Sequence, residues 1–191
     1  TCALPIWLNA AKSNINNAIS FTQTQDNHLR LIGKALDRMS ELSVLAQDIT
    51  KSDADRSLYN SEFVELSDYI TKAATKEFNG VPLFSSTDLD VTVDSDGGVF
   101  TMSGIDLSTS AYTDATGSTI DTLANAKNAL TTVKATINQL SADRASIGSS
   151  QSRLNLTLDQ LSIVAENLTS ASSRIKDVDV AEESANYAKQ S

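Results

Sequence analysis

The chain is poor in the residues that most enzymes and metal sites need. Its 191 residues include one cysteine, Cys2, and one histidine, His28. A single cysteine excludes a disulfide within the chain and a cysteine-based metal site. His28 lies alone on a polar helix face, where we expect a solvated surface residue rather than a catalytic base.

Recognisable catalytic motifs are also missing. The sequence contains no glycine-rich phosphate loop, no HExxH pair and no GxSxG elbow. Four aspartates resemble calcium ligands in type, but their spacing does not match a calcium loop and no closing glutamate is present. We therefore predict that the chain is not an enzyme and has no cofactor or metal site. The four are Asp88, Asp90, Asp94 and Asp96, which we expect at a solvated hairpin tip.

Aromatic residues, long apolar runs and positive charge are scarce as well. Aromatic side chains make up 5% of a chain that is 40% hydrophobic. Small and aliphatic side chains must therefore form the core, which suits narrow seams between helices. No stretch approaches the roughly 20 apolar residues of a membrane span. The formal net charge of −9 argues against binding to nucleic acids or anionic membranes.

One apolar stripe, stepping by three and four residues, dominates the C-terminal half of the chain. Such a repeat, held over about eight heptads, predicts a long helix packed along partner helices. Polar residues interrupt it at Lys127, Arg144, Gln151 and Ser172, which either fix the register of the seam or are turned outward by the bundle geometry. The apolar members are Ile120, Leu123, Leu130, Val133, Ile137, Leu140, Ile147, Leu154, Leu158, Leu161, Ala165, Leu168 and Ile175.

A second long helix is predicted from about Leu8. Gly33 inside it marks either a close approach of a partner helix or a plain propensity defect of about 1 kcal/mol relative to alanine. The main stripe of this helix consists of Ile15, Ala18, Thr22, Gln25, Leu29, Ile32, Leu36 and Met39. A stripe beside it, which predicts contacts on a second side, consists of Leu31, Ala35, Leu42, Leu45 and Ile49.

A third helix is predicted to begin after a polar break at residues 50–55. Ser52 or Asp53 is a natural N-cap, and the helix should run to about Ala74. Because the linker is short, we expect this helix to fold back antiparallel to the preceding one. Its predicted buried face is Tyr59, Phe63, Leu66, Ile70 and Ala73.

Turn and strand signals come after this helix. The pair Asn79-Gly80 supplies the positive φ of a tight turn, and Pro82 excludes a helix nearby. Residues 91–93 and 99–102 alternate as the strands of a β-hairpin. Residues 103–118, rich in serine, threonine and glycine, are predicted to form a loop.

Both ends of the chain depart from the helical pattern. Residues 1–7 match neither the composition nor the period of the helical residues after them, so we interpret them as a non-native segment, with a frayed natural N-terminus as the alternative. Asp179 with Glu182 matches a capping box, which predicts that a new helix begins there.

These signals predict a mainly α fold, an elongated antiparallel helical bundle or coiled coil with a small β-hairpin region. The expected parts are N-terminal rod helices at residues 8–76, a β-hairpin and loop at 77–118, and a long rod helix at 119–176. Residues 177–191 would begin a junction to a core helix that lies outside the chain. We expect residues 8–176 to form one rod domain.

Several runs, in this order, resemble segments of bacterial flagellin. Residues 19–26 (ISFTQTQD) and 36–44 (LDRMSELSV) are similar to the first rod helix, and residues 77–80 (EFNG) to the turn into the hairpin region. Residues 148–154 (GSSQSRL) and 173–186 (SRIKDVDVAEESAN) are similar to the C-terminal rod helix and its junction to the filament core. The resemblance implies the rod-domain fragment of a small flagellin, lacking the variable outer domains and the terminal helices that drive polymerisation.

The resemblance also implies a function, a location and partners. The chain would be a structural subunit of the flagellar filament, the helical propeller of bacterial motility, and would be secreted to the outside of the cell. Implied partners are further copies of the chain, an export chaperone, and cap and junction proteins. A hook–filament junction protein, which shares the rod helices, is the close alternative. A coiled-coil scaffold, which would lack the hairpin insertion, is a remote one.

Two groups of residues match functional positions of the family. Phe78, Asn79 and Gly80 match the region that contacts successive subunits, with a local cover for the open end of the bundle as the alternative. Arg38, Leu42 and Glu62 match a patch that faces a Toll-like innate receptor of animals. The alternative for the patch is an ordinary exposed helix face, on which Arg38 forms weak ion pairs with Glu41 or Glu62.

Overall fold

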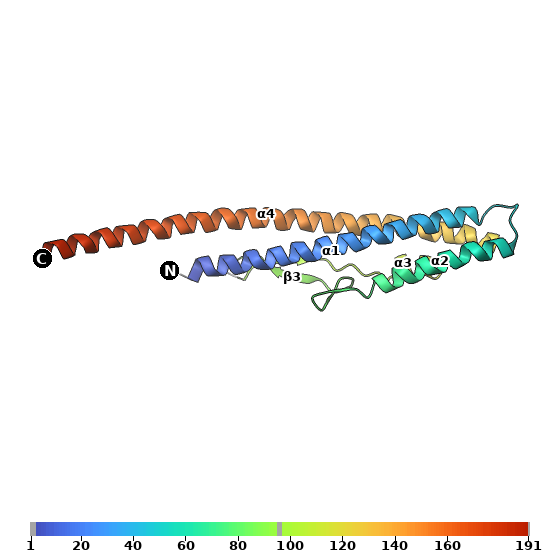
Figure 1. Cartoon of the computed structure of the whole chain (residues 1–191), viewed down its shortest axis with the longest axis horizontal. Coiled ribbons are helices and arrows are strands. Elements are labelled where there is room, and N and C mark those ends of the chain that lie inside the picture. Colours follow the sequence, from blue (N-terminus) through green and yellow to red (C-terminus); the bar gives the residue numbers. More distant parts are fainter. Residues whose placement is uncertain (1–2, 95–96, 191) are drawn as a thin grey trace. The chain divides into compact units, whose positions relative to one another are not determined.

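The computed structural model describes the backbone of residues 3–94 and 97–190, and the side chains of residues 6–94 and 97–174. As predicted, the fold is mainly α with a small β region (Figure 1). The helices of the described residues are α1 (Ala3–Leu45), α2 (Asp53–Ala73), α3 (Ser110–Thr116) and α4 (Leu123–Gln190). Their strands are β1 (Glu77–Phe78), β2 (Val81–Pro82), β3 (Leu89–Thr92) and β4 (Val99–Met102).

The chain divides into two compact units. The first unit comprises Thr1–Ile19, Asp90–Thr101 and Ser152–Ser191, and the second comprises Ser20–Leu89 and Met102–Gln151. Helices α1 and α4 contribute to both units. No helix among the described residues combines the length and the apolar character that crossing a membrane requires.

The predicted main stripe of α1 is buried at all eight positions, each with an exposed fraction of 8% or less. The second stripe is only partly right. Ala35 and Leu42 are buried, but Leu31, Leu45 and Ile49 are exposed. A three-and-four pattern marks apolar positions without showing which flank of the helix a partner covers, and Ile49 lies beyond the end of α1.

In the second unit α1 and α4 run antiparallel, because contacts that advance along α1 recede along α4. Side chains or backbone atoms pair Asp26 with Arg144, Gly33 with Leu140, and Gln47 with Ala126. A Cβ atom added at Gly33 would lie 3.2 Å from Cδ2 of Leu140. Glycine at this position therefore accommodates a close approach of the two helices, the first of the two alternatives.

The polar interruptions of the α4 stripe do not share one environment. Lys127 and Arg144 are exposed, and Arg144 Nε donates to Asp26 Oδ1 at 2.8 Å, whereas Gln151 and Ser172 are half-buried. Bundle geometry thus turns the first two outward. The stripe also misses three small buried residues of α4, which are Ala126, Ala129 and Thr136.

Helix α3 corrects the prediction of a loop over residues 103–118. Tyr112 and Ala115, three positions apart, are buried, and Thr136 Oγ1 of α4 donates to the Ala111 carbonyl at 2.6 Å. The Tyr112 hydroxyl donates to Asp143, and burial raises the pKa of Tyr112 well above its ordinary value. A helix of seven residues is too short for a period of 3.6 to show in sequence.

The predicted helix boundary near Asp179 is also wrong. Helix α4 continues to Gln190 without a break. Aspartate and valine cost well under 1 kcal/mol each in a helix interior, so they do not end a helix that lacks proline and glycine there. At the other end, α1 begins at Ala3 rather than near Leu8, with Pro5 in its first turn, where a missing N–H is harmless.

The connection between α1 and α2 is firmly tied. Ser52 caps α2 as predicted, and Asp55 completes the capping box. Arg56, which is 6% exposed, donates from Nε to the Ala46 carbonyl at 2.7 Å and from Nη2 to the Asp48 carbonyl at 2.8 Å. A guanidinium from α2 therefore binds carbonyl groups at the end of α1, where the helix leaves such groups without partners.

The predicted β-hairpin is present as β3 and β4, which pair with each other. In the first unit, Val91 and Phe100 of this hairpin are buried, as is Leu154 of α4. The guanidinium of Arg153 stacks 4.3 Å from the centroid of the Phe100 ring, a cation–π contact. The hairpin is therefore attached to α4 within this unit.

Candidate functional site

The described side chains of the types that bind metal ions lie apart from one another. Nowhere in the described part of the chain do three or more histidine, cysteine, aspartate or glutamate side chains gather in a way that could hold a metal ion. His28 is half-buried, with its ring edge-on to Phe84 at 6.4 Å between centroids, so it is not the fully solvated residue that we expected. Pattern alone does not reveal that Phe84, far along the chain, covers this face of α1.

The candidate calcium ligands bond to nearby backbone and side-chain groups of the β3–β4 region instead. Asp96 lies outside the described residues, and the other three are exposed. Their hydrogen bonds run from Gly104 N to Asp88 Oδ1 at 2.9 Å, from Thr101 Oγ1 to Asp90 Oδ1 at 2.6 Å, and from Gly98 N to Asp94 Oδ1 at 2.6 Å. Asp94 therefore closes the turn between β3 and β4, whereas Asp88 and Asp90 tie the residues before and in β3 to those in and after β4.

The first surface matched by the resemblance joins α1 to α2. Arg38 donates to both carboxylate oxygens of Glu62, at 2.6 and 2.9 Å, and to Glu41 at 2.8 Å. The ion pairs of the alternative interpretation are thus present. Leu42, by contrast, has an exposed fraction of 0%. Only Arg38 and Glu62 of the three predicted residues offer a surface.

The ion pair between Arg38 and Glu62 shifts the pKa of both side chains. Hydrogen bonds from Arg38 lower the pKa of Glu62, and those to Glu62 and Glu41 raise the pKa of Arg38. A carboxylate with a lowered pKa in the folded state binds fewer protons than it does in the unfolded chain. Its contribution to stability is therefore present above the ordinary glutamate pKa and is lost as the pH falls through the lowered value.

Replacing Glu62 with glutamine should make the chain less sensitive to acid. We expect the melting temperature of the wild type to fall more than that of Glu62→Gln when the pH drops from neutral to below the lowered pKa of Glu62. Carboxylates that do not contact Arg38 contribute equally to both proteins, so the difference reports on the ion pairs of Arg38 with Glu62 and Glu41. Parallel melting curves at every pH would contradict the assignment.

The second predicted surface, Phe78-Asn79-Gly80, is a two-residue hairpin turn. Strands β1 and β2 pair antiparallel, with Glu77 opposite Pro82 and Phe78 opposite Val81. Asn79 and Gly80 have φ values of 51° and 78°, as predicted for a tight Asn-Gly turn. The Phe78 ring meets Phe21 edge-on at 5.9 Å. Phe78 therefore anchors the turn to α1, while Asn79 and Gly80 are exposed.

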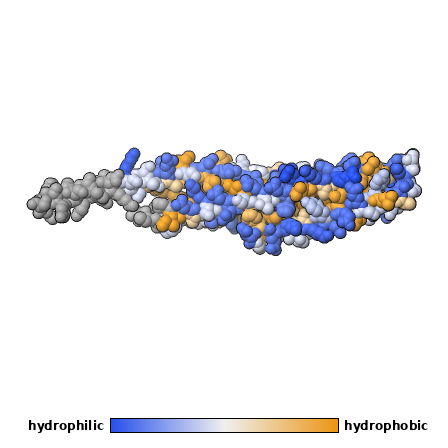
Figure 2. All heavy atoms as spheres, in the orientation of Figure 1, coloured by the Kyte–Doolittle hydropathy of each residue, from blue (hydrophilic) through white to orange (hydrophobic). Residues whose placement is uncertain are grey.

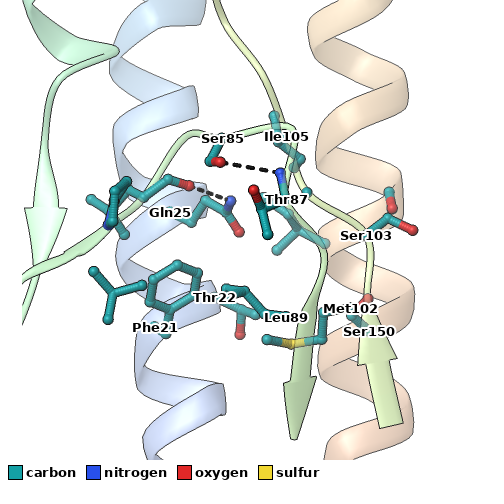
Figure 3. Close-up of a pocket in the computed structure, with 16 residues that line it drawn as sticks. Phe21, Thr22, Gln25, Ser85, Thr87, Leu89, Met102, Ser103, Ile105 and Ser150 are labelled. Carbon is teal, nitrogen blue, oxygen red and sulfur yellow. Dashed lines mark hydrogen bonds between the residues drawn. The ribbon is translucent and has the colours of Figure 1, made fainter.

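A hollow of about 250 Å³ lies beside this turn in the second unit (Figure 3). Four segments line it, which are α1, residues 81–89, residues 102–105 and α4. None of the described residues that line it is charged. Its buried apolar members are Phe21, Leu83, Met102, Ile105 and Ile147.

Polar groups fix the walls of the hollow. Gln25 Nε2 donates to the Leu83 carbonyl at 2.7 Å, and the Thr87 backbone N–H donates to Ser85 Oγ at 3.1 Å (Figure 3). These bonds hold the segment after β2 against α1. The hollow was not predicted from the sequence, because its walls come from four distant segments that share no linear motif.

Gly104→Ala should destabilise the chain by about 2 kcal/mol, since an added Cβ crowds a packed wall. That atom would lie 2.4 Å from the Ser85 carbonyl oxygen and 2.7 Å from that of Thr87. Gly148→Ala is the matched control, because nothing lies within 4 Å of its added Cβ. As a glycine inside α4, it should gain about 1 kcal/mol on replacement by alanine. Urea unfolding of both variants checks this, and equal effects would refute the packing argument.

Comparison with known proteins places the chain in context. Residues 7–88 match the model of the bacterial flagellin N-terminal helical region, and residues 130–191 match that of the bacterial flagellin C-terminal helical region. A flagellin of Halalkalibacterium halodurans is 31% identical over 182 residues, covering 92% of this chain and 66% of that protein. A flagellar filament 33 kDa core protein of Treponema phagedenis is 30% identical over 201 residues, covering 95% of this chain and 70% of that protein. The chain thus spans about two thirds of the length of these relatives.

Solved structures agree. A crystal structure of Bacillus cereus flagellin matches with a TM-score of 0.70 and 28% identity, covering 84% of this chain and 94% of that one. A putative flagellar hook-associated protein from Vibrio parahaemolyticus matches with a TM-score of 0.72 but only 15% identity, covering 87% of this chain and 92% of that one, which shows the shared fold alone. The sequence matches over both helical regions decide between these two relations, and the chain belongs to the bacterial flagellin family, whose members are structural proteins rather than enzymes.

Proposed function

We propose that the chain is a structural subunit of the bacterial flagellar filament. The observation that carries the proposal is the seam of the second unit, where the two regions that match flagellin models pack against each other. Met39, Leu36 and Leu29 of α1 are fully buried, as is Val133 of α4. A seam of this kind stiffens paired helices along their length, which suits a load-bearing polymer rather than a catalyst.

Electron microscopy tests the proposal. The full reading frame that contains this chain, expressed in a bacterium whose own flagellin gene is deleted, should produce extracellular filaments and restore swimming. Dispersed protein from the full reading frame under polymerising conditions would refute the filament function. Short structures confined to the hook end would favour the hook–filament junction role.

Export and its partners belong to the same proposal. The subunit would leave the cell through the flagellar secretion channel with the help of an export chaperone, and would meet cap and junction proteins outside. The 191 residues include one cysteine, so they form no disulfide among themselves that would have to open before export. Recovery of the protein in the growth medium of a wild-type strain, but not of a strain without the secretion channel, tests this step.

The Asn79-Gly80 turn would serve as a subunit contact. This proposal is supported by the different environments of the turn residues. Phe78 packs against Phe21 of α1, whereas Asn79 and Gly80 are exposed and accessible to a neighbouring subunit. Covering the bundle and contacting a neighbour are therefore compatible roles. Asn79→Asp, which adds a charge to the exposed turn, should weaken filaments without changing the melting temperature of the isolated chain.

The surface of Arg38 and Glu62 would face a Toll-like innate receptor. Arg38 and Glu62 are 40% and 47% exposed in their side chains, so both are accessible to a partner. Leu42 would act only by packing beneath them. A cell reporter of the receptor should respond less to Arg38→Ala than to the wild-type chain, with Lys34→Ala on an exposed position of the same helix as control.

A further inference from the structure

The turn between β1 and β2 contains two groups that can react with each other. Its residues, Asn79 and Gly80, are the only Asn-Gly pair of the sequence. In such a pair the backbone nitrogen of the glycine can attack the side-chain carbonyl carbon of the asparagine, because the glycine carries no Cβ beside that nitrogen. The two atoms belong to adjacent residues, so the attack is intramolecular and closes a five-membered ring.

The side chain of Asn79 is accessible and is not held in place. Asn79 and Gly80 are both exposed, and nothing lies within 4 Å of a Cβ atom added at Gly80, so water reaches the turn. Among the described residues, no group forms a hydrogen bond with the side-chain amide of Asn79. Neither a bonded partner nor a packed neighbour therefore keeps this amide away from the Gly80 nitrogen.

The hairpin that carries the pair is small enough to open locally. Strands β1 and β2 have two residues each, and the ladder continues in a bond from the Leu83 backbone N–H to the Lys76 carbonyl at 2.8 Å. Asn79 has a φ of 51°, and ring closure rotates its ψ away from the value of such a turn. A two-stranded hairpin is marginally stable by itself, so this rotation requires opening of the turn and not unfolding of the helices.

Asparagines within the helices are more tightly held. The side-chain oxygen of Asn60 in α2 accepts the Ile120 backbone N–H at 2.8 Å. The nitrogen that would attack Asn125 in α4 is that of Ala126, which donates to the carbonyl four residues earlier at 2.9 Å. Attack by a nitrogen inside a helix requires that the helix opens first, so Asn79 should react before these asparagines.

We propose that Asn79 is a site of spontaneous deamidation, at which the exposed turn modifies itself. The Gly80 nitrogen gives its proton to water and forms a bond with Cγ of Asn79, the Cγ–Nδ2 bond breaks, and ammonia leaves after taking up a proton. Water then opens the resulting succinimide at either carbonyl group, which gives aspartate or isoaspartate at position 79. No oxidant or reductant is consumed. The proposal does not depend on the filament function, because the reaction involves the turn and water alone.

The two products differ in their effect on the hairpin. Aspartate keeps the length of the main chain and suits the first position of this turn type, so it adds a negative charge and leaves the fold in place. Much of the face drawn in Figure 2 is hydrophilic, and a further exposed carboxylate is compatible with such a surface. Isoaspartate instead adds a methylene group to the main chain of the loop, which disturbs the pairing of Phe78 with Val81. The Phe78 ring, 5.9 Å from that of Phe21, should then lose its place against α1.

Ageing of the purified chain in warm neutral buffer tests the proposal. Isoaspartate is detected by enzymatic transfer of a labelled methyl group from S-adenosylmethionine, and peptide mapping locates it. We expect isoaspartate at position 79 to form at least about tenfold faster than at Asn60 or Asn125, whose reaction needs local unfolding. Asn79→Gln is the matched control, because its longer side chain would have to close a six-membered ring, and the labelling should be lost. Circular dichroism checks that this variant is folded.

The free peptide of residues 76–82 sets the time scale of the experiment. A chain that stays unmodified at Asn79 while this peptide is converted would overturn the proposal, because the folded turn would then prevent the reaction. Equal rates at Asn79, Asn60 and Asn125 would overturn it as well.

A second measurement tests the effect on the hairpin. Anion exchange separates the modified chains, which contain both products, from the unmodified chain. The modified chains should melt at a lower temperature than Asn79→Asp, which should melt with the unmodified chain. Modified chains that melt together with Asn79→Asp would show that isoaspartate does not disturb the hairpin.

Discussion

Leu140→Asp should lower the free energy of unfolding by at least about 4 kcal/mol, close to the whole stability of many domains. Leu140 is 5% exposed and lies against Gly33, where α1 and α4 approach each other closely. The substitution removes a packed side chain and places a carboxylate in an apolar seam. Urea unfolding followed by far-UV circular dichroism measures the loss.

A matched variant separates the seam from the helix itself. Ala135 lies on the same helix but is exposed, so Ala135→Asp loses only the difference in helix propensity between alanine and aspartate, roughly 0.7 kcal/mol. Leu154→Asp makes the same test in the first unit, where Leu154 is 0% exposed. An unchanged unfolding midpoint for Leu140→Asp would mean that the seam is not what holds the second unit together.

The helical pattern was the part of the fold most open to prediction. A buried stripe must repeat at the period of the helix, so the main stripe of α1 and the capping box at Ser52 could be read from the sequence. The way in which the partner helices pack against these stripes could not be predicted. The buried residues Ala126 and Ala129 of α4 fall beside the predicted stripe, because small residues admit close packing without an apolar signal of their own.

Short and irregular elements were harder to predict. Helix α3 is stabilised by Tyr112 beneath it and by a hydroxyl of α4, neither of which leaves a periodic trace. The Asn79-Gly80 turn is the opposite case, because positive φ at both positions restricts the residue types that fit. Backbone conformations that only a few residue types adopt can thus be predicted from the sequence, whereas contacts between distant segments cannot.

The candidate surfaces, too, could be predicted only in part. Arg38 and Glu62 stand on the surface as the resemblance implied, but Leu42 is buried, because a match of positions does not distinguish a contact residue from the core beneath it. The hollow needs four segments to exist and has no linear motif. The exposure of Ile49 was likewise hidden, since an apolar residue that continues a three-and-four pattern reads as core.

Arg56→Met should destabilise the second unit by about 3 kcal/mol, although it replaces a charged residue by an apolar one of similar length. The guanidinium side chain is only 7% exposed, and it also pairs with Asp53 at 2.7 Å. Its loss leaves the Ala46 and Asp48 carbonyls without their charged donors. Urea unfolding measures the effect, with Arg30→Met, at an exposed position of α1, as a control expected to change stability by less than about 0.5 kcal/mol.

A charge-preserving variant separates charge from geometry. Arg56→Lys keeps the positive charge but not the fork that reaches both the Ala46 and Asp48 carbonyls, and should restore only part of the lost stability. Full recovery by lysine would show that charge alone acts at this position.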